Sequence, residues 1–304
     1  MVLSQSSRIQ LDPLSSVLDV LDARLSRRTR LEAAGSWALA FPAIDRLKFV
    51  ALLRGTQWML IPGRTPLLMS EGDVCLLGRT PYVVACHPDE MPCDGQALYA
   101  DGCDLARLGG ADTVGVGGTV TLSPVSADFL LDMLPHFMIV PRSSPASGAV
   151  AKILALLNSE LERDMMGSSI VSARLADVLL IEAIRAYAGQ NGGVQTGWLG
   201  ALCDVRIGRS LRAIHEDVSY PWTVAALAGV AGMSRAGFAA EFSRRVGQPP
   251  LTYLRKWRLL LAREALANGD VSVGSIAFKV GYRSQSAFGH AFRRAFGAAP
   301  KADK

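Results

Sequence analysis

Two pairs of neighbouring arginines, Arg244-Arg245 and Arg293-Arg294, lie about 50 residues apart near the end of the chain. A guanidinium group presents its N–H donors in a planar fork that suits the oxygens of a phosphate. Residues 221–304 contain 13 Lys or Arg against four Asp or Glu, whereas residues 1–220 contain 19 against 23. The net charge of +5 therefore comes from one basic segment. This asymmetry favours a nucleic-acid-binding module joined to a mildly acidic domain, with a solvated basic surface as the alternative.

The arginine pairs belong to a longer repeat, in which residues 223–250 (TVAALAGVAGMSRAGFAAEFSRRVGQPP) align with residues 272–300 (SVGSIAFKVGYRSQSAFGHAFRRAFGAAP). Each copy has a small alanine where two helices can cross closely, a turn glycine, a serine that can cap the next helix, and two phenylalanines on one face of that helix. In chain order these are Ala228, Gly232, Ser234, Phe238 and Phe242, and Ala277, Gly281, Ser284, Phe288 and Phe292. The repeat predicts two helix-turn-helix units, whose second helices leave one face free to enter a DNA major groove. An ordinary helical hairpin is the alternative for either copy taken singly.

Residues 212–300 resemble the DNA-binding domain of the AraC-type transcription regulators, which has two helix-turn-helix units joined by a long helix. The joining helix would be residues 250–268, with the Arg258-Leu-Leu-Leu-Ala-Arg263 stretch typical of that family. The upstream region resembles the cupin-type sensor domain of one branch of the family. The matching residues are Asp12-Pro13-Leu14, Gly35-Ser36-Trp37-Ala38, Leu53-Arg54-Gly55, Glu71-Gly72-Asp73 and Gly208-Arg209.

The AraC resemblance implies which side chains face DNA bases. In the second unit they would be Arg283, Gln285, Ser286, Gly289 and His290, and in the first unit Arg235, Ala236, Ala239 and Ala240. Gln can pair bidentately with adenine and Arg with guanine, whereas an alanine side chain makes no hydrogen bond. We therefore expect most base discrimination from the second unit, while the first touches thymine methyls or positions the module. The phosphate contacts would come from Arg244, Arg245, Arg293 and Arg294.

Upstream of the repeat, the spacing of apolar residues and turn signals changes along the chain. Residues 12–25 have helical spacing, and from Leu31 to about Ser123 short apolar runs alternate with Gly, Pro and Asp, which predicts an antiparallel sandwich or barrel. A tight turn is expected at 71–73 and a late strand at 114–122, whose glycines would mark bulges. Further helices are expected at 126–134, 149–164, 169–188 and 199–215. The apolar stripes of the pair at 149–188 suit packing on the sheet domain or on a second copy of the chain.

These patterns predict an α+β protein in three parts. Residues 1–145 would form a cupin-like β-barrel that acts as effector or sensor domain, residues 146–195 a helical linker pair with dimerisation helices, and residues 196–304 an all-α tandem helix-turn-helix domain. The first thirty residues contain no apolar core of a signal peptide, and no uncharged apolar run reaches membrane-spanning length. Five cysteines without a CxxC pair fit reduced thiols. A cytoplasmic location without a membrane partner is therefore expected.

The amino-terminal domain is expected to bind a small-molecule effector. Cupin metal sites use a cluster of histidines with a glutamate, but this stretch offers only His87, with Glu90 and Cys86 nearby, so no metal and no cofactor are expected. A barrel without a metal can still hold a ligand in its interior.

Four guanidinium groups, at Arg24, Arg27, Arg28 and Arg30, fall within seven residues just before the first expected strand. Arg24 and Arg28 resemble the RxxxR motif of PilZ-type cyclic di-GMP receptors, and residues 73–78 loosely match the second PilZ motif, with Cys75 in place of Ser. An anionic effector such as cyclic di-GMP is therefore one hypothesis, and an exposed basic segment is the other.

Together these features predict a sequence-specific transcription regulator that binds double-stranded promoter DNA as a homodimer under control of an effector, with RNA polymerase as a further partner. We do not expect an enzyme. One alternative is a cupin-type metal enzyme fused to a DNA-binding module, although the chain lacks the histidine cluster, a nucleophile–base pair and a phosphate loop. The other is a DNA-binding protein that needs no effector.

Overall fold

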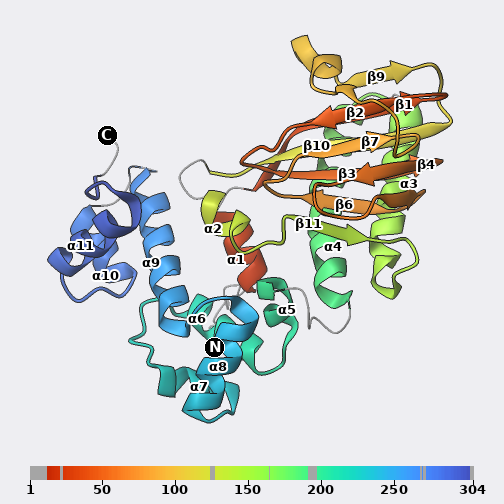
Figure 1. Cartoon of the computed structure of the whole chain (residues 1–304). Helices are drawn as coiled ribbons and strands as arrows, with labels where there is room; N and C mark the ends of the chain where they lie inside the picture. The colour runs from red at the N-terminus through yellow and green to blue at the C-terminus, as the bar shows by residue number, and fades with distance from the viewer. Residues whose placement is uncertain are drawn as a thin grey trace, which may run out of the picture. The chain divides into compact units, whose positions relative to one another are not determined.

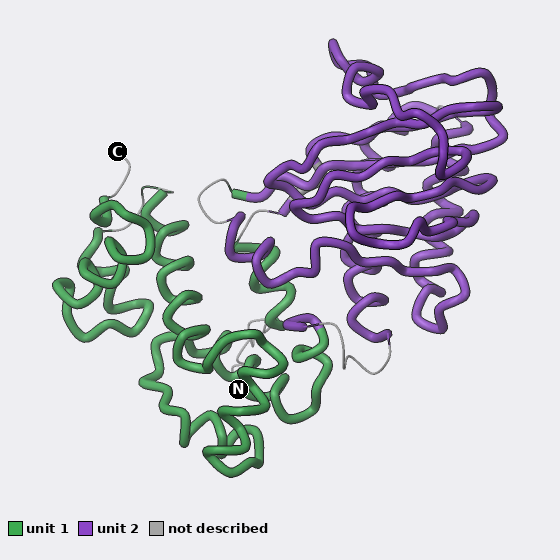
Figure 2. The backbone as a smooth tube through the Cα atoms, viewed as in Figure 1, with its two compact units in different colours: residues 1–22, 123–126, 200–304 green, residues 23–122, 127–199 purple. Residues whose placement is uncertain are grey.

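The computed structural model describes residues 12–20, 23–123, 127–163, 165–190, 197–267, 269 and 272–301 (Figure 1). The chain divides into two compact units (Figure 2). One is β-rich and comprises the described residues of 23–122 and 127–199; the other is helical and comprises those of 1–22, 123–126 and 200–304. This confirms the predicted α+β class, whereas the proposed domain boundaries at 145 and 195 remain predictions.

Two sheets form the centre of the β-rich unit among the described residues. The six-stranded sheet has the order β11 (Phe137–Val140), β6 (Val74–Leu77), β3 (Leu47–Arg54), β10 (Thr113–Thr121), β1 (Arg24–Ala33) and β9 (Leu105–Leu108). The five-stranded sheet has the order β5 (Leu67–Ser70), β4 (Thr56–Leu60), β7 (Tyr82–Ala85), β2 (Ala38–Phe41) and β8 (Cys93–Asp94). Neighbouring strands are antiparallel except for β1 with β9 and β2 with β8.

The core of this unit lies between the two sheets. Alternate side chains of each strand point inward, so that Leu31 and Leu52 of one sheet share a buried cluster with Leu39, Met59 and Val84 of the other. The two-sheet arrangement agrees with the cupin-like fold expected for this region. The turn at 71–73 is also confirmed, because Gly72 has φ +91° between β5 and β6.

The start of the chain differs from the expectation. The helix expected at 12–25 is α1 (Pro13–Val20), and β1 begins at Arg24, so Arg24, Arg27, Arg28 and Arg30 lie within the first strand and not before it. The cause is pairing over a long distance in the sequence: β10 is long enough for its last residue, Thr121, to pair with Arg24. The register shifts between Leu25 and Arg27, which marks a bulge in β1.

Short and long helices complete the β-rich unit. They are η1 (Ala97–Gly102), α2 (Ala127–Leu131), η2 (Pro145–Ser147), α3 (Gly148–Arg163) and α4 (Ser168–Gly189). The expected helices at 149–164 and 169–188 are confirmed as α3 and α4, which pack on each other and against strands of the six-stranded sheet (Figure 1). Their buried faces include Ile153, Leu157, Leu179 and Ala183.

The remaining helices are α5 (Gly197–Cys203), α6 (Ile207–Glu216), α7 (Val224–Ala231), α8 (Arg235–Val246), α9 (Pro250–Ala267), α10 (Val273–Lys279) and α11 (Gln285–Phe296). The single helix expected at 199–215 is wrong, because the chain breaks between α5 and α6. There the Asp204 carboxylate accepts hydrogen bonds from the backbone N–H groups of Arg206 and Ile207, at 2.9 and 2.8 Å, and starts a new helix. α1 packs against α6, and Val17 of α1 is fully buried. None of the helices in the described ranges has both the length and the hydropathy to cross a bilayer.

Candidate nucleic-acid interface and internal cavity

The two predicted helix-turn-helix units are α7–α8 and α10–α11, joined by α9. The Ser234 hydroxyl accepts a hydrogen bond from the Gly237 N–H at 3.2 Å, and the Ser284 hydroxyl accepts one from the Ala287 N–H at the same distance. Gly232 and Gly281 have φ of +64° and +85°. The predicted caps and turn glycines are therefore confirmed, and both second helices start in the same way.

The phenylalanine pairs hold both second helices in the same orientation. In each pair the ring centroids are 5.5 Å apart, with interplanar angles of 58° for Phe238–Phe242 and 56° for Phe288–Phe292. All four rings are buried, as are the small residues Ala228 and Ala277 on the first helices. Burial of one face of α8 and α11 leaves the opposite face to solvent.

The residues predicted to face DNA bases lie on these solvent faces. In the second unit Arg283, Gln285, Ser286 and His290 are exposed and Gly289 is half-buried. In the first unit Arg235, Ala236 and Ala240 are exposed and Ala239 is half-buried. The same scaffold thus presents polar side chains on α11 and mostly methyl groups on α8.

The two arginine pairs differ in their surroundings. Both Nε and one terminal nitrogen of Arg244 donate to the Glu241 carboxylate, at 2.9 and 2.7 Å. Arg245 also donates to Glu241, at 2.5 Å, and a further nitrogen of Arg245 lies 3.3 Å from Asp204. These hydrogen bonds, first from Arg244 and then from Arg245, lower the pKa of Glu241 to about 2.

The repeat places Ala291 where the first unit has Glu241. Arg293 and Arg294 are exposed, whereas the Arg245 side chain is only 16% exposed. The four predicted phosphate contacts are therefore not equivalent: the second pair extends into solvent, and Arg245 is held within the helical unit.

Arg258 on α9 joins the two units through backbone carbonyls. Its guanidinium donates to the carbonyl oxygens of Val218 at 2.8 Å, Tyr220 at 2.7 Å and Gly281 at 3.3 Å. The first two precede α7, and the third belongs to the turn of the second unit. Partial burial lowers the pKa of Arg258. The sequence marked this arginine only as part of a family stretch, because its partners are backbone atoms that no pattern of side chains reveals.

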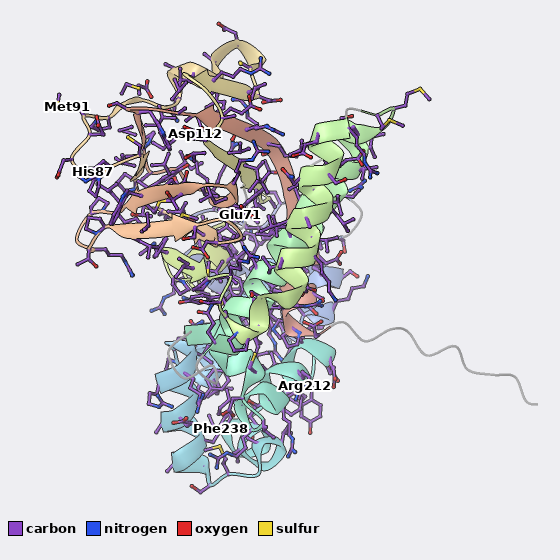
Figure 3. The ribbon with its side chains drawn as sticks, turned by 90° about the vertical axis from the view of Figure 1, so that its right-hand side faces the viewer. Glu71, His87, Met91, Asp112, Arg212 and Phe238 are labelled. Atoms are coloured by element: carbon purple, nitrogen blue, oxygen red, sulfur yellow. The ribbon has the colours of Figure 1, made fainter. Side chains whose placement is uncertain are left out.

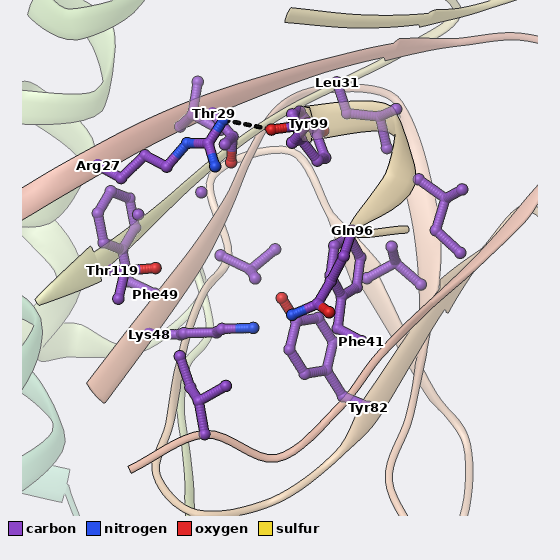
Figure 4. A pocket seen from close by; sticks show the side chains of 18 of the residues that line it. Arg27, Thr29, Leu31, Phe41, Lys48, Phe49, Tyr82, Gln96, Tyr99 and Thr119 are labelled. Carbon is purple, nitrogen blue, oxygen red and sulfur yellow. Dashed lines mark hydrogen bonds between the residues drawn. The ribbon is translucent and has the colours of Figure 1, made fainter. Parts of the chain in front are cut away.

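A cavity of about 690 Å³ lies within the β-rich unit (Figure 4). Its walls come from both sheets and from η1 and include apolar and aromatic side chains such as Leu31, Leu39, Phe41, Val50, Tyr82, Val84 and Tyr99. The polar side chains of the lining are Ser26, Arg27, Thr29, Asp45, Arg46, Lys48, Gln57, Gln96 and Thr119. A cavity that combines apolar walls with polar groups is typical of a small-molecule site.

The glycines of β10 make room for this cavity. Gly115 and Gly117 both line it, and a Cβ on Gly117 would lie 3.1 Å from the Thr29 hydroxyl. The expected bulge is confirmed at one place, since the register with β3 shifts between Val114 and Gly115. The larger effect of these glycines is that no side chain of theirs fills the space between the sheets.

Lys48 of β3 extends into the cavity toward two aromatic rings (Figure 4). Its Nζ lies 5.3 Å from the ring centroid of Phe41 and 5.2 Å from that of Tyr82, and the two rings stack at 5.0 Å. Burial lowers the pKa of Lys48. Sequence reasoning treated LKFVALL as an apolar run and missed this lysine, although a charge on the inward face of a strand was the available signal.

The structure does not gather the four arginines of β1 at one site. Arg27 lines the cavity, but its guanidinium donates to the carbonyl oxygens of Tyr99 and Cys103, at 2.5 and 2.9 Å, and to the Asp104 carboxylate at 3.1 Å. Arg30 Nε lies 2.9 Å from Glu32 Oε1. Neither Arg28 nor Arg30 lines the cavity, and the side chain of Arg24 lies outside what the structure describes.

The residues compared with the second PilZ motif support the turn between β5 and β6. The Asp73 carboxylate accepts hydrogen bonds from the backbone N–H groups of Ser70 at 2.8 Å and Arg142 at 2.7 Å. Cys75 is fully buried, with its thiol 3.6 Å from the Met69 sulfur. These two side chains stabilise the fold and do not line the cavity.

His87, Glu90 and Cys86 follow β7. Figure 3 shows His87 at the outer edge of the β-rich unit, and its side chain is 62% exposed. Across the described residues, no three His, Cys, Asp or Glu side chains are placed to hold a metal ion together.

The chain thus combines a β-rich unit around an internal cavity with two helix-turn-helix units that share one connecting helix. This combination defines the class, a DNA-binding regulator with a separate β-rich domain. Family comparison agrees: residues 12–189 match a family model described as Cupin, and residues 227–303 match one described as Helix-turn-helix domain.

Transcription regulators align with this chain over almost their whole length. A protein of Streptomyces antibioticus described as an AraC-like transcription regulator is 37% identical over 294 residues, which cover 95% of this chain and 97% of the relative. The HTH-type transcriptional regulator AlkR of Acinetobacter baylyi is 29% identical over 303 residues, covering 96% and 98%. The chain belongs to the AraC family of transcription regulators. The alternative of a cupin enzyme is therefore set aside.

Solved structures give more distant matches. The DNA-binding domain of AdpA in complex with a target DNA is 32% identical, covers 32% of this chain and 87% of its own, and has a TM-score of 0.31. ToxT of Vibrio cholerae with a bound unsaturated fatty acid is 12% identical, covers 91% and 93%, and has a TM-score of 0.36. TM-scores this low do not define equivalent positions.

Proposed function

We propose that this regulator recognises promoter DNA mainly through α11, with α8 as a positioning contact, and that an effector in the cavity between the sheets controls it. One observation carries the first part: both units have the same caps and phenylalanine geometry, but α11 exposes Ser286 and His290 where α8 exposes Ala236 and Ala240. The first position of each helix is polar in both units, Gln285 on α11 and Arg235 on α8. Equal scaffolds with unequal surface chemistry imply unequal recognition.

The connecting helix suits this arrangement. α9 has 18 residues, so it spans roughly 27 Å at the rise of an α-helix. Successive major grooves on one face of DNA are roughly 34 Å apart, a distance of the same order as the length of α9. Exposed Arg293 and Arg294 are suited to phosphate contacts, whereas Arg245 is suited to a structural role because Glu241 and Asp204 already hold it.

The reader and positioner roles can be separated by selection from random DNA. Gln285→Ala and His290→Ala should relax the preferred bases under α11, since a bidentate base contact discriminates by about 1–3 kcal/mol. Arg293→Ala should weaken binding evenly across sequences and lower the salt slope by about 1. Arg107→Ala, 72% exposed on β9 of the β-rich unit, is the matched control. If the glutamine and arginine variants change binding in the same way, the division of roles is wrong.

The cavity is large enough for an effector, and its lining residues bear on the cyclic di-GMP hypothesis. That ligand carries two phosphates, whereas Arg27 and Arg30 are already paired and Arg28 does not line the cavity. The placement therefore favours a smaller anion over cyclic di-GMP. Calorimetric titration with cyclic di-GMP tests this directly, and heat that disappears in Arg27→Ala would restore the larger ligand.

We also propose a homodimer through α3 and α4, acting on promoters in the cytoplasm together with RNA polymerase. Apolar side chains stay exposed on these two helices, among them Leu156 at 58%, Ile170 at 68% and Val178 at 46%. Covering such a face with a second copy removes apolar area from water. Light scattering on Ile170→Glu tests the dimer: an unchanged dimer mass would contradict this surface.

A further inference from the structure

Lys48 breaks the apolar pattern of the inward face of β3. Lys48, Val50 and Leu52 alternate along the strand, and Val50 and Leu52 pack into the core between the sheets. An ammonium group that leaves water loses solvation free energy unless an opposite charge or a hydrogen-bond acceptor replaces the water. The aromatic faces of Phe41 and Tyr82 supply part of that replacement.

No described carboxylate forms an ion pair with Lys48. Asp45 is the acidic residue that lines the cavity, and it accepts a hydrogen bond from Arg79 Nε at 2.9 Å. Arg79 also binds Asp128 of α2 and Asp132 just after this helix, so Asp45 is already paired outside the cavity. Burial in this cavity lowers the pKa of Lys48, because it disfavours the charged amine. An anion bound beside Nζ would have the opposite effect and favour the charged form.

The walls around Lys48 suit a flat or slender apolar body. Phe41 and Tyr82 form one wall as stacked rings, continued by Leu39 and Val84 of the same sheet. The opposite wall is the backbone of β10 at Gly115 and Gly117, which has no side chain to interrupt it. A space between stacked rings and a glycine-lined strand favours hydrocarbon or aromatic groups, and the ammonium group of Lys48 offers a place for a charged end.

We propose that the cavity binds an amphipathic monocarboxylate, with its carboxylate at Lys48 and its hydrocarbon or aromatic body between the Phe41–Tyr82 rings and the glycines of β10. This inference rests on the proposed effector cavity and names the class of molecule that occupies it. Two other cationic side chains that the structure describes line the cavity, but Arg27 is paired with Asp104 and Arg46 is exposed to solvent. A single internal cation favours one negative charge over two.

The test uses the full chain and probes that share a body and differ in charge. Calorimetry compares 4-phenylbutyrate with 4-phenylbutanamide and 4-phenylbutylamine, and decanoate with decanamide. A charge-assisted hydrogen bond contributes about 1.5–3 kcal/mol, so each carboxylate should bind roughly 10- to 100-fold tighter than its amide. The amine should bind more weakly than the amide, because it would place a second cation beside Lys48.

Variants test which residues contact the carboxylate of the ligand and which contact its apolar body. Lys48→Met keeps the length of the side chain and should abolish the preference for carboxylate, whereas Lys48→Arg should retain it. Lys152→Met, on an exposed lysine of α3, is the matched control and should bind as the unmodified chain does. A Cβ on Gly115 would meet only ordinary contacts, at 3.7 and 3.8 Å, so Gly115→Ala should fold normally. Gly115→Val should then weaken carboxylate and amide alike by narrowing the space.

Three outcomes overturn the proposal: carboxylates that bind no better than amides, a carboxylate preference that survives in Lys48→Met, or no carboxylate binding at millimolar concentration. DNA binding of the same preparations is measured separately. Tight amide binding with intact DNA binding would retain the effector cavity and reject only the monocarboxylate. If the unmodified chain does not bind DNA, the proposed function is wrong, but the ligand measurements still test the monocarboxylate site.

Discussion

Gly232 and Gly281 occupy the same place in the two helix-turn-helix units, yet substitution by alanine should have different consequences. Both have positive φ, +64° and +85°. A Cβ built on Gly232 meets nothing within 4 Å. A Cβ built on Gly281 would lie 2.7 Å from a terminal nitrogen of Arg258 and 2.7 Å from the Ser219 carbonyl oxygen. The first substitution therefore changes the backbone preference alone, and the second also collides with the contacts that join the two units.

The magnitudes follow from these surroundings. An alanine in the left-handed region costs about 1–2 kcal/mol, which is the whole expected effect of Gly232→Ala. In Gly281→Ala the Arg258 guanidinium must also move, and it would lose at least one of its hydrogen bonds to carbonyl oxygens. Because Arg258 is half-buried, we take the lower end for a charged hydrogen bond and add about 1.5–2 kcal/mol. Gly281→Ala should thus lower the free energy of unfolding by about 3 kcal/mol.

Urea unfolding of both variants measures the difference, with an unchanged slope showing that the denatured state is the same. In an Arg258→Ala background the extra penalty of Gly281→Ala should shrink, because the guanidinium is absent and only the collision with the Ser219 carbonyl oxygen remains. DNA affinity should fall more in Gly281→Ala than in Gly232→Ala, since only the former disturbs the spacing of α8 and α11. Equal destabilisation by the two substitutions, or an Arg258→Ala background that leaves the penalty intact, would refute this reasoning.

Two further predictions concern titratable groups of the helical unit. Glu241→Gln should free the Arg244 guanidinium for contact with DNA phosphates, which should raise DNA affinity a few-fold and steepen its salt dependence. Glu216→Gln, at the end of α6, is the control for the change in net charge. Equal effects of the two substitutions would contradict the release of Arg244. His215 is half-buried, with Nε2 2.7 Å from the Tyr253 hydroxyl, and desolvation lowers its pKa to about 3 from 6.5. Between these pH values the unfolded state binds more protons than the folded state, so stability should be lost as pH falls below 6.5, by at most about 1.4 kcal/mol per pH unit. Urea unfolding of His215→Phe should show a flatter pH profile, with the exposed His87→Phe as control, and an unchanged profile in His215→Phe would reject the assignment.

The helical unit was predictable because its signals are local. A capping serine, a turn glycine and two phenylalanines four residues apart act within one or two helical turns, and the repeat supplied each of them twice. The restraint on Arg244 and Arg245 was also accessible, since Glu241 lies three and four residues before them. The break at Asp204 was missed because the apolar spacing continues across it, although an acidic residue before Ile207 was a possible cap.

The β-rich unit was predictable in class and not in detail. Short apolar runs and turn residues indicate strands, but strand pairing depends on residues far apart in the chain. The partner of Arg24 is Thr121, nearly 100 residues away, so no local pattern indicates that β1 extends to include the four arginines. The position of Lys48 in the cavity likewise depends on Phe41 and Tyr82, which lie on the opposite sheet. The cavity could be expected from the family resemblance, but its charge could not.

The small helix α1 has a consequence for how the regulator can be divided. It precedes the whole β-rich unit in the chain, yet it packs on α6, and its Val17 is fully buried. The helical unit is therefore encoded discontinuously, with the β-rich unit inserted between its first helix and the rest. A gene fragment that starts at residue 196 encodes both helix-turn-helix units and leaves the face of α6 that α1 covers open to water. A synthetic peptide of residues 12–20 is the complement of such a fragment, so the helical unit without its β-rich insertion is naturally assembled from two separate chains.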